Sequence, residues 1–444
     1  MDATAPKTQL GKNLFNDYGM VFVLLLLVVV LSALTLKEQS PEGEEAGRIV
    51  AERIIAEQGA NVSVMVVAES TPVDEAFVRG AVAALETAGA TIAGSVNGKP
   101  TDARVAIEKA LAEGKTIDAV AATGDTVEWT IYDRFDGIGS DKCVSPVPYT
   151  WPTFAKLDNL LSVANQTAIY AIIAIGMTMV IITAGIDLSV GSLVALASVT
   201  AAIAIRDFGG GENASMAMML AGCTAGIIVC GLAGLFNGAM ITRFGIPPFI
   251  ATLAMMMMAK GLSLRLAVGE SISEVPDSFK WIGGGTTLGL PNPVILMIVL
   301  YAVAHFVMSS TIFGRYVYAV GGNAEAARLS GVAVKPVTLT VYTLCGALAG
   351  LGGIVQSSKL GTGDPKLGLM YELDVIAAVV VGGTSLMGGE GRIFGTLIGA
   401  FIIAVIKNGM NLMDVGSYDQ QIVLGAVVLV AVLVDTIKRK GGRG

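Results

Sequence analysis

Long apolar runs follow one another along this chain from Asn165 onward. A helix needs about 20 apolar residues to cross a bilayer, and most of these runs have that length. Hydrophobic residues make up 53% of the chain and charged residues only 15%, which is more apolar surface than a soluble core requires. The runs predict nine membrane spans, near residues 165–184, 188–206, 216–241, 247–267, 293–311, 338–357, 371–386, 391–411 and 420–437.

An earlier apolar run, residues 18–36, follows Lys7 and Lys12. We interpret it as a first transmembrane helix, because it is longer than a signal-peptide core and no small-residue cleavage site is evident. The basic residues before it place the N-terminal segment 1–17 in the cytoplasm. With about ten spans, an even number, the basic tail 438–444 lies on the same side. The expected fold class is therefore an all-α polytopic membrane protein.

Residues 37–156 differ from the rest of the chain in charge and in pattern. Residues 37–150 hold 19 acidic and 10 basic residues. Apolar runs suited to strands alternate with helical patterns, which predicts a small parallel three-layer α/β domain. Because it follows the first helix, we expect this insert to be extracytoplasmic. The expected strands are Asn61–Glu69, Thr91–Val96 and Thr116–Thr123, and the expected helices are Pro72–Ala88, Thr101–Gly114 and Asp125–Phe135.

Two stretches interrupt the apolar pattern in a similar way. They are Met179–Ser192, which reads MVIITAGIDLSVGS, and Val379–Gly391, which reads VVVGGTSLMGGEG. Each passes from an apolar run through glycine, small hydroxyl and acidic residues into a helix rich in glycine and alanine. Paired glycine-interrupted segments point to the substrate path of a transporter. We therefore expect two broken-helix segments in the membrane part.

Asp187 is the most informative residue of the first break, because sequence suited to a bilayer flanks it on both sides. An ionisable group at that depth is costly unless it finds partners or water, and it marks a functional site by default. One hypothesis is that Asp187 lines the path, and the other is that it caps the helix that follows. Both hypotheses stay open at this point. The candidate substrate-path residues are Thr183, Gly185, Asp187, Ser189, Thr384 and Ser385.

Residues 312–336 form the longest polar segment of the membrane part. Three basic residues oppose one acid, Glu325, which favours a cytoplasmic location. Gly321-Gly322 breaks the chain, and Asn323 can then cap a short helix that has Glu325 in its first turn and Gly331 at its end. Such a helix is what a soluble partner needs in order to push on a membrane protein. An ordinary basic loop would satisfy the same charge bias.

Several other kinds of site are not expected. No GxxxxGK[ST] motif occurs, so any ATP hydrolysis needs another polypeptide and the chain is not expected to be an enzyme. The four cysteines lack metal-ligand spacing, and the run Met255–Met258 indicates adaptable packing rather than a copper site. His305 lies on an apolar helix without a nearby carboxylate, which favours a packed residue over a proton relay. We therefore expect no metal, no cofactor and no nucleic-acid partner.

With these residues identified, the chain resembles the permease subunits of ribose-type ABC sugar importers. The strings ITAGIDLSVGS and GGNAEAARLSG are the most recognisable of that family, and both occur in their expected places. Two further similar stretches are FNGAMITRFGIPPFIATLAMMM and YELDVIAAVVVGGTSLMGGEGRIFGTLIGA. The resemblance covers about residues 157–437, together with the first helix.

This resemblance implies a permease of the bacterial inner membrane that forms a homodimer or heterodimer. It would receive a pentose or hexose from an extracytoplasmic sugar-binding protein and move it by alternating access, powered by a cytoplasmic ATPase. The translocation region of the family falls on residues 183–192 and 382–389. Its ATPase-coupling loop falls on Ala319–Gly331, where the candidate coupling residues are Gly322, Asn323, Glu325, Ala326, Arg328 and Gly331.

The insert 37–156 departs from the family pattern, in which a short linker follows the first helix. It vaguely resembles one lobe of a periplasmic sugar-binding protein, but a single lobe offers half a cleft at best, so we favour a docking module. Two other functions remain as alternatives. A membrane-anchored sugar receptor would need a cytoplasmic output domain, whereas few residues follow Asp435. An ion-coupled secondary transporter would need more intramembrane charge pairs than Asp187, His305, Asp374 and Lys407 supply.

Overall fold

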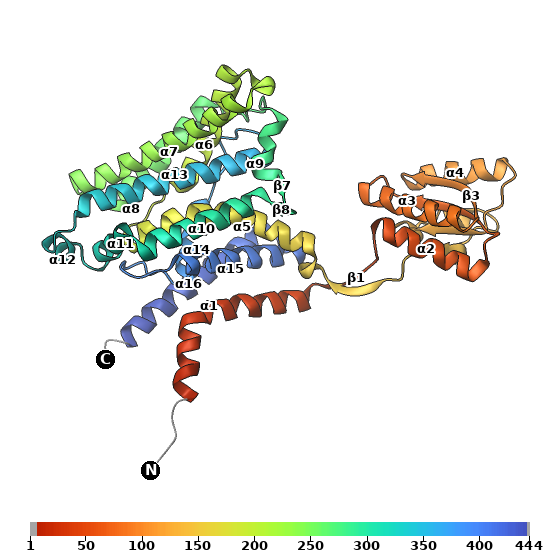
Figure 1. Cartoon of the computed structure of the whole chain (residues 1–444), viewed down its shortest axis with the longest axis horizontal. Helices are drawn as coiled ribbons and strands as arrows, with labels where there is room; N and C mark the ends of the chain where they lie inside the picture. Colours follow the sequence, from red (N-terminus) through yellow and green to blue (C-terminus); the bar gives the residue numbers. More distant parts are fainter. Residues whose placement is uncertain (1–6, 442–444) are drawn as a thin grey trace, which may run out of the picture. The chain divides into compact units, whose positions relative to one another are not determined.

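The computed structural model describes residues 7–441, which divide into two compact units. The α/β unit comprises Leu36–Thr153, and the helical unit comprises the described residues before and after it. We describe each unit by itself. The long helices of the helical unit are α1 (Lys7–Leu34), α5 (Leu157–Ile182), α6 (Val190–Ile203), α7 (Met216–Phe244), α8 (Pro248–Leu266), α10 (Asn292–Ser310), α13 (Val334–Leu360), α14 (Tyr371–Val381), α15 (Ile393–Leu412) and α16 (Ser417–Gly441) (Figure 1).

Within the described residues, seven helices are long and apolar enough to cross a membrane: α5, α6 with its π-helical extension to Phe208, α7, α8, α10, α13 and α15. Shorter apolar stretches occupy Gly19–Leu34 in α1 and Ser417–Leu433 in α16. The polytopic membrane class is therefore supported, whereas the count of ten spans is not confirmed. The span expected at 371–386 is wrong as a continuous helix, because α14 has 11 residues and a length of only ~16 Å.

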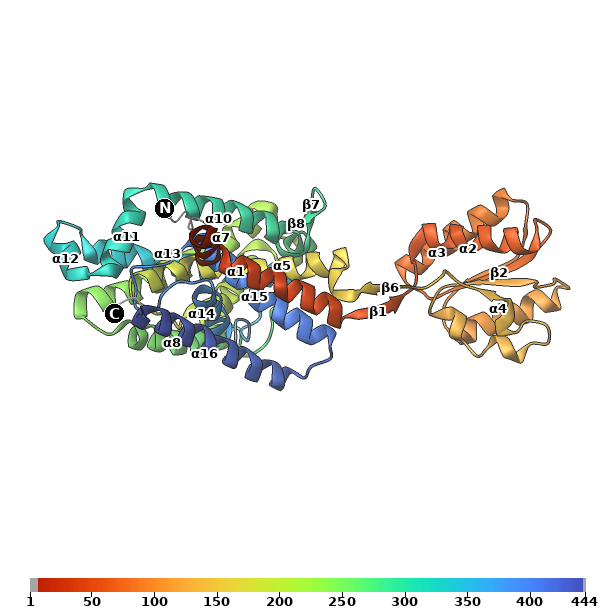
Figure 2. The same cartoon turned by 90° about the horizontal axis from the view of Figure 1, so that it is seen from below.

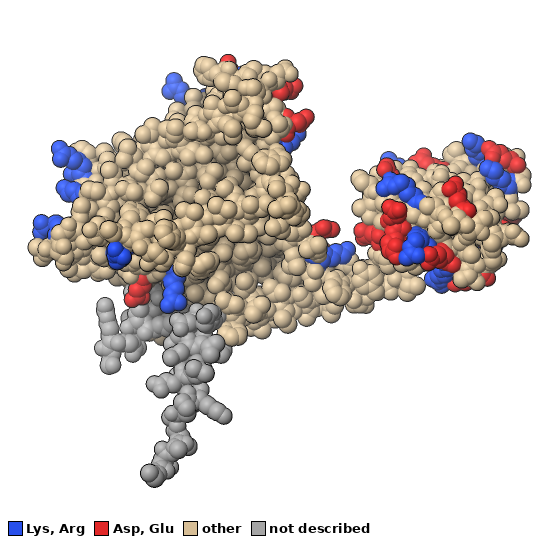
Figure 3. Space-filling view, viewed as in Figure 1, with Lys and Arg blue, Asp and Glu red and all other residues tan. Residues whose placement is uncertain are grey.

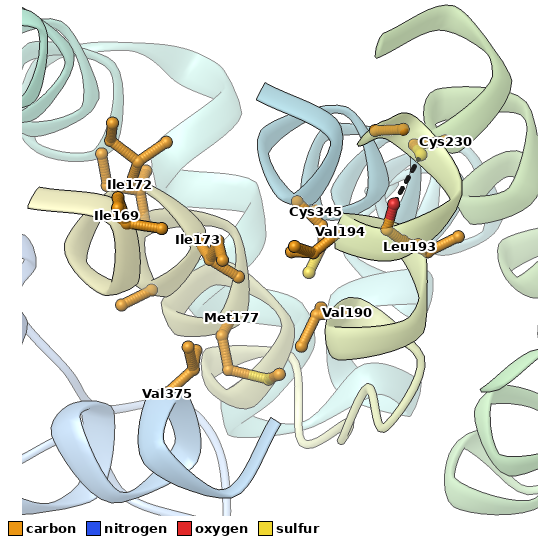
Figure 4. Close-up of a cluster of buried hydrophobic side chains, with 14 of the residues drawn as sticks. Ile169, Ile172, Ile173, Met177, Val190, Leu193, Val194, Cys230, Cys345 and Val375 are labelled. Atoms are coloured by element: carbon orange, nitrogen blue, oxygen red, sulfur yellow. Dashed lines mark hydrogen bonds between the residues drawn. The ribbon is translucent and has the colours of Figure 1, made fainter. Parts of the chain in front are cut away.

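Helix α5 lies at the centre of the helical unit. In its most apolar stretch 83% of the residues are buried, and it packs against α10, α13, α14 and α15. Figure 4 shows Ile169, Ile172, Ile173 and Met177 of α5 in this core, with Val375 of α14 close to Met177. Gly176 allows α13 to approach, because a Cβ there would lie 2.6 Å from the Cα of Cys345. Small residues permit such close helix contacts in membranes.

The α/β unit contains a four-stranded sheet of order β3-β2-β4-β5 in which all pairs are parallel. Side chains alternate across β2, so that Val64 and Val66 pack under α2 and α3 while Met65 and Val67 pack on the opposite face with α4. The result is three layers. The elements are β1 (Leu36–Gln39), α2 (Gly43–Gln58), β2 (Ser63–Ala68), α3 (Pro72–Thr87), β3 (Thr91–Asn97), α4 (Pro100–Ala112), β4 (Ala119–Ala122), β5 (Cys143–Val144) and β6 (Tyr149–Pro152).

The third helix expected in this unit, Asp125–Phe135, is wrong. The segment forms two 3₁₀ turns, Thr126–Glu128 and Tyr132–Arg134. The hydroxyl of Thr126 donates to the carbonyl of Val67 (3.0 Å) and Tyr132 is fully buried, so tertiary contacts with the sheet replace a regular helix. The sequence reasoning also missed helix α2 and the antiparallel ribbon of β1 and β6, which lie side by side (Figure 2).

Candidate functional site

The two breaks in the apolar pattern are in direct contact. The first connects α5 to α6 and comprises residues 183–189, and the second connects α14 to α15 and comprises residues 382–392. The backbone N–H of Gly389 donates to the carbonyl of Ile182 at 2.8 Å, which joins the second break to the end of α5. Segments about 200 residues apart in sequence therefore form one structural feature.

Helix α11 (Ile312–Gly322) ends against both breaks. A Cβ on Gly321 would overlap the carbonyl oxygen of Ile182 and would lie 2.7 Å from the nitrogen of Gly389. A Cβ on Gly388 would lie 2.8 Å from the carbonyl oxygen of Gly321. The hydroxyl of Tyr318 on α11 also donates to the carbonyl of Gly391 at 2.8 Å. We call this contact of Ile182, Gly321, Gly388 and Gly389 the glycine junction.

Asp187 is fully buried and holds the start of α6. Its Oδ1 accepts hydrogen bonds from the backbone N–H (2.8 Å) and the hydroxyl (2.6 Å) of Ser189. The amide of Asn237 on α7 donates to the Ser189 hydroxyl at 3.2 Å. The hydroxyl of Thr252 on α8 donates to the carbonyl of Ile186 at 3.3 Å. The first break is thus tied to two neighbouring helices by hydrogen bonds, of which the one from Asn237 is buried.

Four buried polar atoms at the two breaks have no hydrogen-bond partner among the described residues: Asp187 Oδ2, Asn237 Oδ1 and the hydroxyls of Tyr342 and Thr384. The Tyr342 hydroxyl occupies the space beside Gly185, where a Cβ would overlap it. Sequence reasoning missed Asn237 and Tyr342. An asparagine within the apolar stretch of α7 was the available indication, because polar groups in membrane helices usually have partners in the bundle.

The structure gathers the six candidate path residues around the two breaks but leaves little of them exposed. Thr183 is half-buried, and the other five are buried. In the second break, the Ser385 hydroxyl accepts from the N–H of Met387 at 3.2 Å, which stabilises the turn. Five of the six are therefore buried in this conformation and present no side chain to solvent.

The short helix expected after Gly322 is present as α12 (Ala324–Leu329). Asn323 Oδ1 accepts from the N–H of Ala326 at 2.9 Å, and Gly331 follows with a φ of +87°. Arg328 Nε donates to Glu325 Oε2 at 3.1 Å, and this contact lowers the pKa of the Glu325 carboxyl. Ala327 is buried, while Glu325, Ala326 and Arg328 are exposed.

The first half of the 312–336 segment is not the open soluble loop that its sequence suggested. Helix α11 runs through Gly321 and Gly322, and Val317 and Val320 are buried in the core of the helical unit. The chain breaks only at Asn323, whose backbone is extended. Helix α11 therefore connects α12 directly to the glycine junction.

Within residues 7–441, no group of three or more His, Cys, Asp or Glu side chains is arranged to hold a metal ion. His305 packs against Phe394 with ring centres 4.6 Å apart. The four cysteines are free thiols.

A family model described as the branched-chain amino acid transport system / permease component matches residues 159–433. This chain belongs to that family. The ribose import permease protein RbsC of Escherichia coli K12 is 44% identical over 292 residues, covering 65% of this chain and 88% of that protein. RbsC of Bacillus subtilis is 44% identical over 289 residues (65% and 87%), and the L-arabinose permease protein AraH of Azospirillum brasilense is 36% identical over 294 residues (66% and 84%).

No solved structure matches the chain. The likeness to ribose-type ABC permeases covers the helical unit from α5 to α16, and the matched range begins after the α/β unit. The chain is therefore a multi-pass ABC transport permease of the inner membrane. The resemblance stated from its motifs is confirmed.

Proposed function

We propose that this permease is the membrane subunit of an ATP-driven importer that moves a monosaccharide, a ribose-like pentose or a hexose, by alternating access. The observation that carries the proposal is the glycine junction. It places the end of α11, which leads directly into the exposed helix α12, in backbone contact with both breaks. The sugar class is supported by the ribose, L-arabinose and D-allose permeases among its relatives.

In this proposal a cytoplasmic ABC ATPase binds α12. The coupling residues are Gly322, Asn323, Glu325, Ala326, Arg328 and Gly331, which build the cap, the exposed face and the end of that helix. Figure 3 supports the orientation, because Lys and Arg side chains gather at the end of the helical unit that carries α11 and α12. That end then faces the cytoplasm, together with both termini.

We assign the path role to the breaks as a whole. A displacement of α12 would be transmitted through Gly321 to Ile182 and Gly389, and the two breaks would then move together. Asp187, Ser189 and Gly185 hold the conformation of the first break, and Ser385 holds a turn of the second. Thr384 is buried beside Gly391, and Thr183 is half-buried. A complete path needs two permease subunits, which a homodimer or heterodimer in the bilayer supplies.

On the extracytoplasmic side of the membrane, a sugar-binding protein would deliver the sugar. We propose that the α/β unit lies on that side and modulates docking of the binding protein. A single three-layer unit of this kind has no second lobe with which to close over a ligand.

The test is uptake in proteoliposomes that contain the full chain, a candidate ABC ATPase and a candidate sugar-binding protein. We expect uptake of labelled D-ribose, L-arabinose or D-allose into the vesicles. This uptake should require ATP enclosed in the vesicle lumen, which corresponds to the cytoplasm. Uptake that follows an imposed ion gradient and ignores ATP would contradict the proposal and favour a secondary transporter.

A further inference from the structure

An ion pair lies inside the membrane part, between α14 and α15. Lys407 Nζ is 2.6 Å from Asp374 Oδ2 and 5.3 Å from the ring centre of Tyr170 on α5. Tyr170 packs against Tyr371, with ring centres 4.6 Å apart and planes tilted by 50°. We call Tyr170, Tyr371, Asp374 and Lys407 the intramembrane polar site.

Tyr170 lies five residues inside the span expected at 165–184, and Lys407 lies four residues before the end of the span expected at 391–411. Tyr170 is near the middle of α5, which runs from Leu157 to Ile182. A lysine near a helix end usually extends toward the closest membrane surface. Lys407 does not, because its ammonium group lies against Asp374 and over the Tyr170 ring, which belong to neighbouring helices.

Protein atoms do not seal the pair. The side chains of Lys407 and Asp374 remain 28% and 18% exposed. Charged groups in contact with lipid are costly, and those in membrane helices face the bundle interior or a water-filled cavity. The exposed edges of this pair therefore belong to a surface that meets water during the transport cycle.

Helix α14 begins at this site because the chain before it is not helical. Residues 361–370 run beside α6, since the N–H of Asp364 donates to the Ser198 hydroxyl at 3.1 Å and a Cβ on Gly368 would overlap the carbonyl oxygen of Gly191. Met370, with a φ of +68°, turns the chain into the helix. Irregular backbone at such a depth is tolerated where it lines a cavity or is buried in protein, and half-helix N-termini of this kind face substrates in transporters.

Glu372 connects this site to the first break. Its Oε2 lies where a Cβ on Gly191 would be, at the start of α6 and two residues after Ser189. Two aromatic faces, a carboxylate and an ammonium group therefore converge from α5, α14 and α15.

We propose that the intramembrane polar site is a contact site for the transported monosaccharide. The proposal rests on the proposed function, and it names where the permease itself recognises its substrate. The C–H face of a sugar ring packs against the tyrosine rings, and its hydroxyls bond to the Asp374 carboxylate and the Lys407 ammonium. Few polar groups placed among aromatic side chains are the usual composition of a small-ligand site.

The competing explanation is an ion pair that only holds α14 against α15. A reversed pair distinguishes the two, because Asp374→Lys combined with Lys407→Asp keeps the mutual attraction but changes which group faces the sugar. We expect Asp374→Asn and Lys407→Met to lower ATP-dependent uptake of D-ribose by about tenfold or more, the loss that follows from about 1.4 kcal/mol. We expect the reversed pair to reach the wild-type amount in membranes and still to show that loss.

A matched control is Asp207→Asn, which removes the partner of Arg206 in an exposed ion pair outside this site. It should leave uptake at the wild-type level. Recovery of uptake by the reversed pair would overturn the proposal and leave an ion pair that only joins two helices.

A second measurement tests the proposal even if the charge variants insert poorly into the membrane. Tyr170→Phe keeps the aromatic face and Tyr170→Leu removes it, so we expect near-normal uptake for the first and a loss of about tenfold for the second at equal membrane amounts. Asp374→Asn should also change the ratio of D-ribose to 2-deoxy-D-ribose uptake, because the carboxylate bonds sugar hydroxyls, whereas a packing defect would leave the ratio unchanged. Equal uptake by the two Tyr170 variants, with an unchanged ratio in Asp374→Asn, would overturn the proposal. If the wild type moves none of D-ribose, L-arabinose and D-allose, the proposed function itself fails.

Discussion

Asp187 has two carboxyl oxygens in different surroundings. Oδ1 accepts two hydrogen bonds from Ser189, whereas Oδ2 has no partner among the described residues. A buried polar atom without a partner costs about 1–3 kcal/mol. Oδ1 forms a turn with Ser189, the N-cap residue of α6, and α6 has no side-chain cap hydrogen bond. Asp187 therefore orients the residue that precedes the helix rather than capping the helix itself, and the path hypothesis stays open.

We predict that Asp187→Ala lowers sugar uptake more than it lowers the amount of permease in the membrane, and that Asp187→Asn is intermediate. The amide oxygen of asparagine can still accept from Ser189, whereas alanine loses both hydrogen bonds, each of which contributes about 1 kcal/mol. The measurement is uptake normalised to permease in isolated membranes. Wild-type uptake by the alanine variant on that scale would show that Asp187 is neither important for the first break nor part of the path.

Gly321 is the residue through which α11 touches both breaks. We predict that Gly321→Ala separates α11 from the junction, because the added methyl group would overlap the carbonyl of Ile182. Overpacking of this kind costs about 1–3 kcal/mol. Uptake and sugar-stimulated ATPase activity should both fall. Gly425→Ala is the matched control, since a Cβ there meets nothing within 4 Å, and equal behaviour of the two variants would refute the role of the junction.

At the scale of elements, α12 is a six-residue helix whose exposed side chains are available to a partner. We predict that Arg328→Glu and Gly331→Pro each abolish uptake while the permease still inserts. The first reverses a charge on the exposed face, and the second is incompatible with a φ of +87°, since proline requires a φ near −65°.

The readout for α12 is the amount of ATPase that co-purifies with the permease. Arg243→Glu provides the control, because it makes the same charge change in the last turn of α7. Normal co-purification and uptake in both α12 variants would contradict the assignment of α12 as the coupling element.

The elements also show what could be predicted from the sequence. The cap of α12 could be, because Asn323 and Gly331 act on backbone groups within a few residues of themselves. The short length of α14 could be predicted only in part, since the sequence shows the glycine break at 382–383 but the expected span still extends to residue 386, and the contact of Gly382 with Gly395 of α15 is visible only in the fold. The glycine junction could not be predicted from the sequence either, because each of its glycines contacts a segment that is far away in sequence. For the same reason the sequence located Asp187 but not Asn237 or Tyr342.

At the scale of the whole molecule, the α/β unit has its two ends side by side. Leu36 of β1 and Pro152 of β6 are paired in an antiparallel ribbon. Within the helical unit, the N–H of Phe154 donates to the Thr35 hydroxyl at 3.1 Å. A domain whose ends meet can be inserted into a surface loop, or removed from it, without distortion of either part.

Cys143 is the single cysteine of residues 36–153, and burial raises its pKa from about 9 to about 12. The folded unit therefore keeps this thiol protonated where the unfolded chain would lose the proton. We predict that the stability gained from this difference is complete below about pH 9 and is lost as the pH rises toward 12. Denaturant midpoints of the isolated unit between pH 8 and 10, compared with those of Cys143→Ser, would test this, and a parallel pH dependence in the two proteins would contradict it.

The last prediction concerns the α/β unit as an independent part. Residues 36–153 have a sheet covered on both faces by their own buried clusters, so the unit expressed alone should be soluble, monomeric and cooperatively unfolding. Alkylation of Cys143 at pH 8 should be slow until the unit unfolds, which gives a direct measure of the fold.

In the full chain, replacement of residues 36–153 by a short Gly-Ser linker between Thr35 and Phe154 should preserve membrane insertion and part of the sugar-dependent ATPase stimulation, while it changes the affinity for the sugar-binding protein. Calorimetry on the isolated unit with D-ribose, L-arabinose and D-allose decides between docking and sensing, because a dissociation constant of about 1 mM or lower, equivalent to about −4 kcal/mol, would show that one lobe suffices to bind sugar and would favour a receptor role for this unit.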